Sequence, residues 1–283
     1  MKNKLYLLFI VLFFSTYFYS IIEEDPLPTL GDYSSASISL SGEYNLGRLW
    51  LAMYRGSTKE HSDPLMRTYL EDLIYRLSET SEVRDRRFEF IVLEDESINA
   101  FAAPGGIIGI NLGMFLNTQK EGELASVMCH ELAHLSQRHY ARSQNKNSPL
   151  ANALMILGSI AVAAASRNPE AILIAPAAMQ QMSINYTRSN EKEADRIGFN
   201  NLIKAGFDPN DMTMMFQRMQ DKYQNEDSEQ FSYLMTHPLP SERLTDMRIR
   251  SDSLDKSFND SFRDNIDFYF MKKRAETWAE SDN

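Results

Sequence analysis

Five consecutive residues, His130-Glu131-Leu132-Ala133-His134, constrain the fold more than any other feature of this 283-residue chain. The apolar pattern of residues 121–142 predicts an amphipathic helix around them. On a helix, a spacing of four residues places both imidazoles on one face, one turn apart. Two neutral imidazoles so arranged are suited to Zn²⁺, and the glutamate between them can accept a proton from an activated water. We therefore predict one Zn²⁺ per chain, bound by His130 and His134, with Glu131 as general base.

A zinc ion that promotes hydrolysis keeps three protein ligands and one open position, so a second segment must supply the third ligand. His139 lies five residues after His134, which on a continuous helix turns it away from the metal, and we expect it to face solvent. A later acidic run is a better source. Glu191 and Asp195 are four residues apart and share one helix face, whereas Glu193 points elsewhere. One of the two carboxylates can bind zinc while the other accepts a hydrogen bond from a ligand histidine.

Composition excludes several other classes of protein. The chain has 29 Lys and Arg against 39 Asp and Glu, a formal net charge of −10, and this acidic balance argues against nucleic acid as a partner. The single cysteine, Cys129, excludes an intrachain disulfide scaffold and a thiolate-rich zinc site. We expect Cys129 to be a small buried side chain that faces away from the metal.

The N-terminus has the pattern of an export signal. Lys2 and Lys4 precede a charge-free run from Leu5 to Ile22, and three acidic residues follow it. This charge asymmetry keeps the N-terminus in the cytoplasm and sends the remainder across the membrane. We predict a signal peptide over residues 1–20, with an uncleaved anchor ending near residue 22 as the alternative. Either interpretation places the chain from about residue 26 outside the cytoplasm.

The rest of the chain predicts a mostly helical α+β domain with one small sheet early in the sequence. Residues 26–41, rich in Pro, Gly and Ser, are expected to form an extended lead-in. Alternating apolar residues and a Gly pair predict strands at 88–93, 98–102 and 105–111. Proline and capping residues predict helices that begin near residues 64, 169, 209 and 241, and the last 20 residues are also expected to be helical. The second of these helices is expected to reach about Ala205.

Residues 147–182 contain two apolar segments separated by a short turn. The first, from Asn147 to Ser166, carries no charge. This hairpin could form a lid, a peripheral membrane contact or part of the core. A bilayer span is the weaker interpretation because Ala, Asn and Gly dilute its hydrophobicity.

Three segments, HELAH at 130–134, NEKEADRIGF at 190–199 and THPLPSER at 236–243, resemble metallopeptidase family 48. This family includes the HtpX proteases, the CAAX prenyl proteases and the BepA-like periplasmic proteases, and the chain is most similar to the BepA-like peptidase domain. The resemblance covers residues 60–250. It implies a zincin-type metallopeptidase fold with a small sheet next to the zinc-binding helix, and a zinc-dependent endopeptidase of the gluzincin type. We thus expect residues 21–283 to form a single metallopeptidase domain, without a tetratricopeptide-repeat domain.

The resemblance also implies roles for particular residues. Glu191 would be the third zinc ligand, and Asp195 would hold a ligand histidine. His237 and Arg243 would be catalytic residues beside Glu131. An edge strand would pair with extended substrate; its residues are Asn99, Ala100, Phe101 and Ala102.

For His237 and for Arg243, the residues themselves leave two roles open. His237 could cap the fourth zinc position or donate to the developing oxyanion. Arg243 could pair with a carboxylate near the metal or hold a substrate carbonyl.

The resemblance implies an exported, periplasmic enzyme, either free or attached to a membrane, that degrades misfolded or stalled envelope and outer-membrane proteins. Two alternatives are open. One is a non-catalytic, chaperone-like binding module of outer-membrane assembly, which the intact Glu131 disfavours. The other is a membrane-embedded protease of the HtpX kind, which would require the apolar hairpin to span the bilayer.

Overall fold

The computed structural model describes residues 38–56, 58–144, 186–225, 232–254 and 265–282. The predicted export signal and the apolar hairpin at 147–182 lie outside these residues. Within the described ranges, no helix combines the length and the apolar character needed to cross a membrane. The predicted division of the chain into a signal and one domain stays a prediction.

The sheet has three strands in the order β1-β3-β2. Strand β1 (Glu89–Leu93) pairs in parallel with β3 (Ile107–Asn111), and β2 (Ala100–Ala103) pairs antiparallel with β3. The β2–β3 turn contains Gly105 and Gly106, both at φ 78°, a conformation that side chains rarely adopt. The three predicted strands are confirmed, with ends shifted by one or two residues, and β2 lies at an edge of the sheet.

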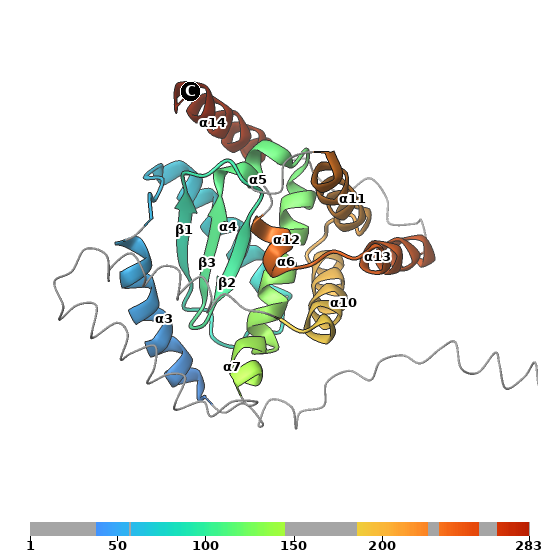
Figure 1. The fold of residues 1–283 in the computed structure, drawn as a ribbon, viewed down its shortest axis with the longest axis horizontal. Coiled ribbons are helices and arrows are strands. Elements are labelled where there is room, and N and C mark those ends of the chain that lie inside the picture. Colours follow the sequence, from blue (N-terminus) through green and yellow to red (C-terminus); the bar gives the residue numbers. More distant parts are fainter. Residues whose placement is uncertain (1–37, 57, 145–185, 226–231, 255–264, 283) are drawn as a thin grey trace, which may run out of the picture. The chain divides into compact units, whose positions relative to one another are not determined.

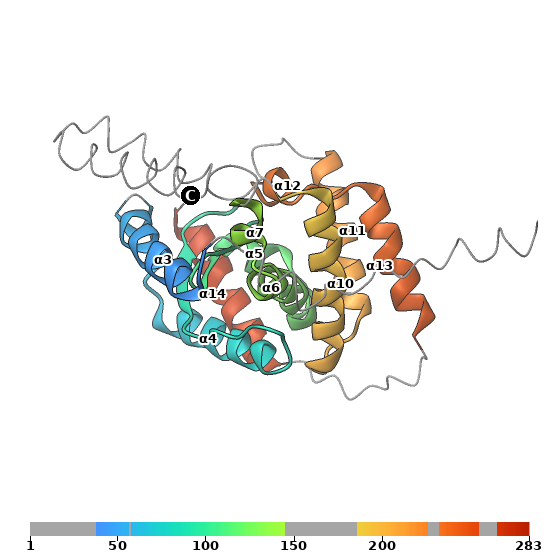
Figure 2. The same cartoon turned by 90° about the horizontal axis from the view of Figure 1, so that it is seen from below.

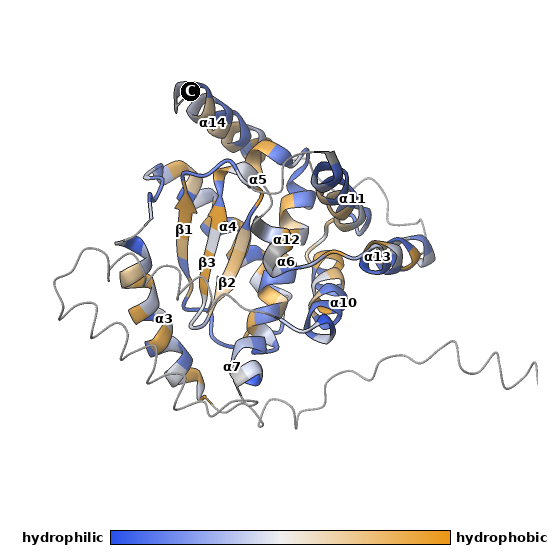
Figure 3. Ribbon diagram, viewed as in Figure 1, coloured by the Kyte–Doolittle hydropathy of each residue, from blue (hydrophilic) through white to orange (hydrophobic). Residues whose placement is uncertain are grey.

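Alternation of side chains along the strands gives the sheet two buried faces. Phe90, Val92 and Ile108 belong to the main core, which includes residues of α4 (Pro64–Glu79) and α6 (Glu121–Ser136). Ile91 and Ile107 pack on the opposite face with apolar residues of α3 (Leu40–Arg55). All three strands are accordingly hydrophobic in Figure 3, because helices cover both faces.

Local capping fixes where the first two helices begin. Asp63 Oδ1 accepts hydrogen bonds from the backbone N–H groups of Leu65 and Met66, and Pro64 is the first residue of α4, as predicted. Ser39 caps α3 in the same way. The predicted extended lead-in is therefore wrong at residues 40 and 41, which already belong to this helix.

Helix α6 differs from its prediction in two ways. It is buried on all sides rather than amphipathic: every residue from Glu121 to Ser136 is buried except Leu135, which is partly buried. It also ends at Ser136, and a separate short helix, α7 (His139–Gln144), follows. The break lies at Arg138, whose φ of 51° is left-handed. Figure 2 shows why α6 lacks a solvent face, since other elements surround it when it is viewed nearly end-on.

The remaining described helices are α5 Leu112–Asn117, α10 Arg188–Lys204, α11 Asn210–Asn225, α12 Ser232–Thr236, α13 Ser241–Ser253 and α14 Ile266–Asp282. Of these, α10 and α11 pack against α6, whereas α13 packs against α10 and α11, and α14 against α4 and α5 (Figure 1). The predicted helices near residues 209 and 241 and at the C-terminus are confirmed. The helix predicted from residue 169 to about Ala205 ends as expected. Its predicted start lies outside the described residues, and α10 begins at Arg188, capped by Thr187.

Helices α6 and α10 pack so closely that one position on α10 has no room for a side chain. A Cβ atom at Gly198 would lie 3.0 Å from both Cα and N of His130. Contacts between real Cβ atoms and backbone are rarely so short, and backbone atoms cannot rotate away. Gly198 therefore sets the distance between α6 and the acidic residues of α10.

We expect Gly198→Ala to lower the free energy of unfolding by about 1–3 kcal/mol, because the two backbones must separate. Denaturant unfolding measures this loss. The matched control is Asn200→Ala, an exposed position on the same helix, where we expect a change within about 0.5 kcal/mol. Equal stability of the Gly198 variant and the wild-type protein would contradict this account of the packing.

Candidate metal centre

The two histidines of the HELAH segment converge as their spacing predicts. His130 Nε2 and His134 Nε2 are 2.9 Å apart, and both side chains are buried on α6. Because α6 is a regular helix here, its geometry alone holds the two rings on one face. Two imidazole nitrogens buried this close together are suited to share a cation.

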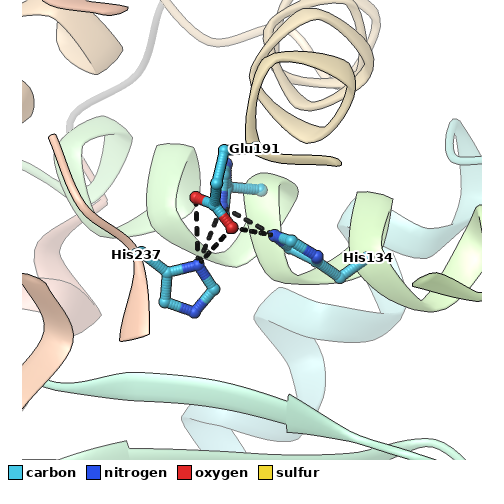
Figure 4. Close-up of side chains that lie close together, drawn as sticks. His134, Glu191 and His237 are labelled. Carbon is cyan, nitrogen blue, oxygen red and sulfur yellow. Dashed lines mark hydrogen bonds and ion pairs between the residues drawn. The ribbon is translucent and has the colours of Figure 1, made fainter. Parts of the chain in front are cut away.

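Helix α10 brings one carboxylate to this pair. Glu191 Oε1 lies 3.4 Å from His134 Nε2, and Glu191 Oε2 lies 3.5 Å from His130 Nε2. The close-up in Figure 4 shows the Glu191 carboxylate between His134 and His237. The carboxylate is buried, 3% of the side chain being exposed, so its negative charge faces the ring nitrogens instead of water.

His237 follows α12 and approaches the same point from a third segment. Its Nδ1 lies 3.1 and 3.2 Å from the two Glu191 oxygens and 3.4 Å from His130 Nε2. One potential ligand atom from each of His130, His134, Glu191 and His237 lies within 4.8 Å of the others. A buried set of imidazole nitrogens and one carboxylate is the chemistry that Zn²⁺ prefers, so these residues fit a zinc ion.

The ring of His237 is held by its own short helix. Tyr233, one turn earlier, stacks on it with ring centroids 4.6 Å apart and planes inclined by 22°. The backbone N–H of His237 donates to the carbonyl of Tyr233. The Tyr233 N–H in turn donates to the carbonyl of Ile98, just before β2, at 3.3 Å. The segment that carries His237 is thus fastened to the edge of the sheet.

Asp195 and Arg243 contact two of the four potential ligands. Asp195 Oδ1 lies 3.0 Å from His130 Nδ1, where a carboxylate can hold the ring in the orientation that frees Nε2 for a metal. Arg243 donates to both Asp195 oxygens at 2.6 and 2.7 Å and pairs with Glu191 Oε2 at 2.9 Å. Burial disfavours the charged carboxyl of Asp195, but Arg243 and His130 outweigh it and hold its pKa below the usual value. Of the two predicted roles for Arg243, its contacts match the pairing with carboxylates.

The expectation that His139 faces solvent is wrong. Its side chain is fully buried, its Nδ1 lies 2.9 Å from His134 Nδ1, and its Nε2 lies 3.0 Å from Glu193 Oε2. The expectation assumed a continuous helix, whereas the left-handed Arg138 turns the chain back at the end of α6. Glu193 does point away from the four potential ligand atoms, as predicted, and its carboxylate contacts His139 instead.

Glu131 presents one paired and one unpaired carboxylate oxygen. Its Oε2 accepts a hydrogen bond from the backbone N–H of Ala102 at 3.0 Å. Its Oε1 has no hydrogen-bond partner among the described residues and lies 3.5 Å from His237 Nε2. Burial raises the pKa of Glu131, although the nearby histidines oppose this shift. An orphaned oxygen on a buried carboxylate beside the cluster is suited to accept a proton from water.

The segment predicted to bind substrate lies beside this carboxylate. Ala100, Phe101 and Ala102 are in β2, and Asn99 directly precedes it, its carbonyl accepting from the Asn111 N–H of β3. The Asn99, Phe101 and Ala103 positions therefore face β3, and the alternate backbone groups point to the open edge. The Ala102 N–H on that edge is the group that Glu131 contacts.

Sequence reasoning missed two aromatic side chains at the site. Tyr186 stacks on His134, with ring centroids 3.9 Å apart and planes inclined by 18°. Tyr233 stacks on His237 and is buried. Neither lies in a recognisable motif, although Tyr233 is one helical turn before the His-Pro pair. Cys129, by contrast, is buried as predicted, 3.4 Å from the Asn201 amide, and burial raises the pKa of its thiol.

Comparison with known proteins agrees with this geometry. The model of peptidase family M48 matches residues 64–251. A provisionally named beta-barrel assembly-enhancing protease of Vibrio cholerae is 41% identical over 82% of this chain and 49% of its own length. The beta-barrel assembly-enhancing protease of Escherichia coli K12 is 36% identical over 89% of this chain and 52% of its own.

A more distant relative is the mitochondrial metalloendopeptidase OMA1 of Schizosaccharomyces pombe, 25% identical over 81% of this chain and 66% of that protein. The chain spans about half the length of the two bacterial relatives.

We expect Arg243→Met to lower the free energy of unfolding by about 3–5 kcal/mol, because two buried carboxylates lose their shared cation. The control is Arg250→Met on the same helix, which removes only an exposed ion pair with Asp246 and should cost less than about 0.5 kcal/mol. Unfolding in denaturant, with metal removed from all samples, compares the two variants. Similar losses for both would mean that Arg243 does not stabilise the acidic face of α10.

Proposed function

The chain belongs to peptidase family M48, a family of zinc-dependent metalloendopeptidases, and from this premise we propose that it cleaves misfolded or stalled proteins of the bacterial cell envelope. The observation that carries the catalytic part is Oε1 of Glu131, which has no hydrogen-bond partner among the described residues and lies beside four convergent potential ligands. A binding module without turnover would have no use for this buried carboxylate.

His130, His134 and Glu191 would hold the ion, which supplies positive charge that polarises a peptide carbonyl and lowers the pKa of a water molecule. Glu131 accepts the proton of that water at Oε1 and delivers it to the leaving amine. The Ala102 N–H keeps the other oxygen in place, so the carboxylate has one orientation for both transfers. Asp195 orients His130, and Arg243 balances the charge of Asp195 and Glu191.

The open edge of β2 supports an extended polypeptide as substrate. A chain added there as a further strand would pair with main-chain groups of β2 other than the Ala102 N–H, which already donates to Glu131. Such main-chain hydrogen bonds are independent of sequence. The added chain would also lie next to Glu131, because this carboxylate already contacts the edge at Ala102. Recognition through the main chain suits an enzyme that acts on unfolded clients of many sequences.

The envelope role rests on two further observations. The bacterial relatives are named beta-barrel assembly-enhancing proteases, and the first 25 residues have the pattern of an export signal. We therefore propose a periplasmic location and outer-membrane proteins as clients.

Two variants separate proton transfer from metal binding. We expect Glu131→Gln to retain one zinc per chain and to lose casein hydrolysis, because an amide cannot accept the proton. We expect Glu191→Ala to lose zinc as well as hydrolysis, because a carboxylate ligand is removed. Metal analysis and digestion with and without a chelator measure both effects. Hydrolysis by Glu131→Gln at the wild-type rate would exclude the general-base role, and full zinc content in Glu191→Ala would exclude the ligand role.

We propose that His237 caps the fourth position of the metal in a latent state. In support, its Nδ1 faces the other potential ligands and its ring is packed against Tyr233. We expect His237→Ala to raise casein hydrolysis, with His61→Ala, a histidine paired with Glu94, as the control.

A fall in turnover of about 10²-fold with zinc retained would instead assign His237 to stabilisation of the transition state. An unchanged rate would exclude both roles.

A further inference from the structure

We propose that His139 and Glu193 are positioning residues for the metal site: a histidine–histidine–carboxylate chain in which they hold His134 in the orientation that binds zinc. This inference rests on the proposed role of His134 as a ligand.

Three consecutive contacts form the chain. His134 Nδ1 lies 2.9 Å from His139 Nδ1, and His139 Nε2 lies 3.0 Å from Glu193 Oε2. Arg142 donates to the same Glu193 oxygen at 3.0 Å, which ties the end of the chain to α7. His134 and His139 are buried, so water does not compete for these contacts.

Only one arrangement of protons satisfies all the contacts. A metal on His134 Nε2 leaves the ring proton on Nδ1, which must donate to His139 Nδ1. His139 then carries its own proton on Nε2 and donates it to the carboxylate of Glu193, which has no proton to offer. The carboxylate therefore fixes the tautomer of His139, and His139 fixes that of His134.

The two ligand histidines thus differ in their support. His130 reaches a carboxylate directly, since its Nδ1 is 3.0 Å from Asp195 Oδ1. His134 reaches Glu193 only through the ring of His139. Residues 191, 193 and 195 of α10 consequently have three separate tasks: one carboxylate faces the potential metal position, one ends the His139 chain and one holds His130.

The backbone break at the end of α6 makes this chain possible. On a continuous helix His139 would lie about 140° around the axis from His134. The left-handed Arg138 returns it to the same side, and the buried ion pair from Arg138 Nε to Glu43 Oε2, at 2.8 Å, holds the turn. A left-handed conformation is strained for a residue other than glycine, and a strained position of this kind at a metal site points to a local requirement.

The test compares zinc affinity in His139→Leu and His139→Gln, measured by competition with a chromogenic chelator. The Gln side chain can accept from His134 through its oxygen and donate to Glu193 through its nitrogen, whereas Leu can do neither. We expect Leu to raise the Kd for zinc about 10–100-fold and Gln to restore most of the affinity. At saturating zinc both variants should bind one ion.

A second variant covers the case in which His139→Leu fails to fold. We expect Glu193→Gln to raise the Kd for zinc about 10-fold, with Lys192→Gln, an exposed change on the same helix, leaving it unchanged. Wild-type affinity in Glu193→Gln, or equal losses in the Leu and Gln variants of His139, would overturn the proposal. Failure of the underlying ligand assignment gives a different result, because His134→Ala would then keep its zinc.

Discussion

The rest of the site depends on the ion pairs that the buried guanidinium of Arg243 makes with Asp195 and Glu191. Helix α6 has no solvent face, yet Glu131, Glu191 and Asp195 converge around its histidines with almost no exposure. Carboxylates so close together repel one another and lose their hydration, and both effects favour separation of α10 from α6. Arg243 pairs with two of the three and also donates to the Pro238 carbonyl. One side chain of α13 thereby fixes α10 and the segment that carries His237 relative to α6.

Features set by neighbouring residues could be predicted from the sequence. The capped start of α4, the turn between β2 and β3, and the paired histidines of α6 each depend on a few adjacent side chains, and all three are confirmed. The burial of α6 on every side and the break at Arg138 could not be predicted in this way. Glu43, which holds the break through its ion pair with Arg138, is 95 residues away in the sequence. The sequence around residue 138 therefore does not indicate the break. The error at His139 follows directly, as does the failure to find its contact with Glu193.

The aromatic residues at the site were missed for a related reason. Tyr186 and Tyr233 contact His134 and His237 through ring faces, and a ring face requires no particular spacing from the motif that it supports. Chemical motifs reveal residues that bind or transfer protons, because that chemistry demands certain side chains. The residues that hold those side chains in place can be of many types, and only their contacts identify them.

The hydrogen bond from the Tyr233 N–H to the Ile98 carbonyl has a consequence for the geometry of cleavage. It engages the Ile98 carbonyl at the edge of the sheet just before β2, so the first turn of α12 blocks that end of the edge. Under the proposed function, a polypeptide added beside Ala100 and Ala102 cannot continue past this end of the strand. The edge that binds the client would then be blocked at one end, and the distance from α12 to Glu131 would limit how many residues of a client can lie between the cleaved bond and the blocked end.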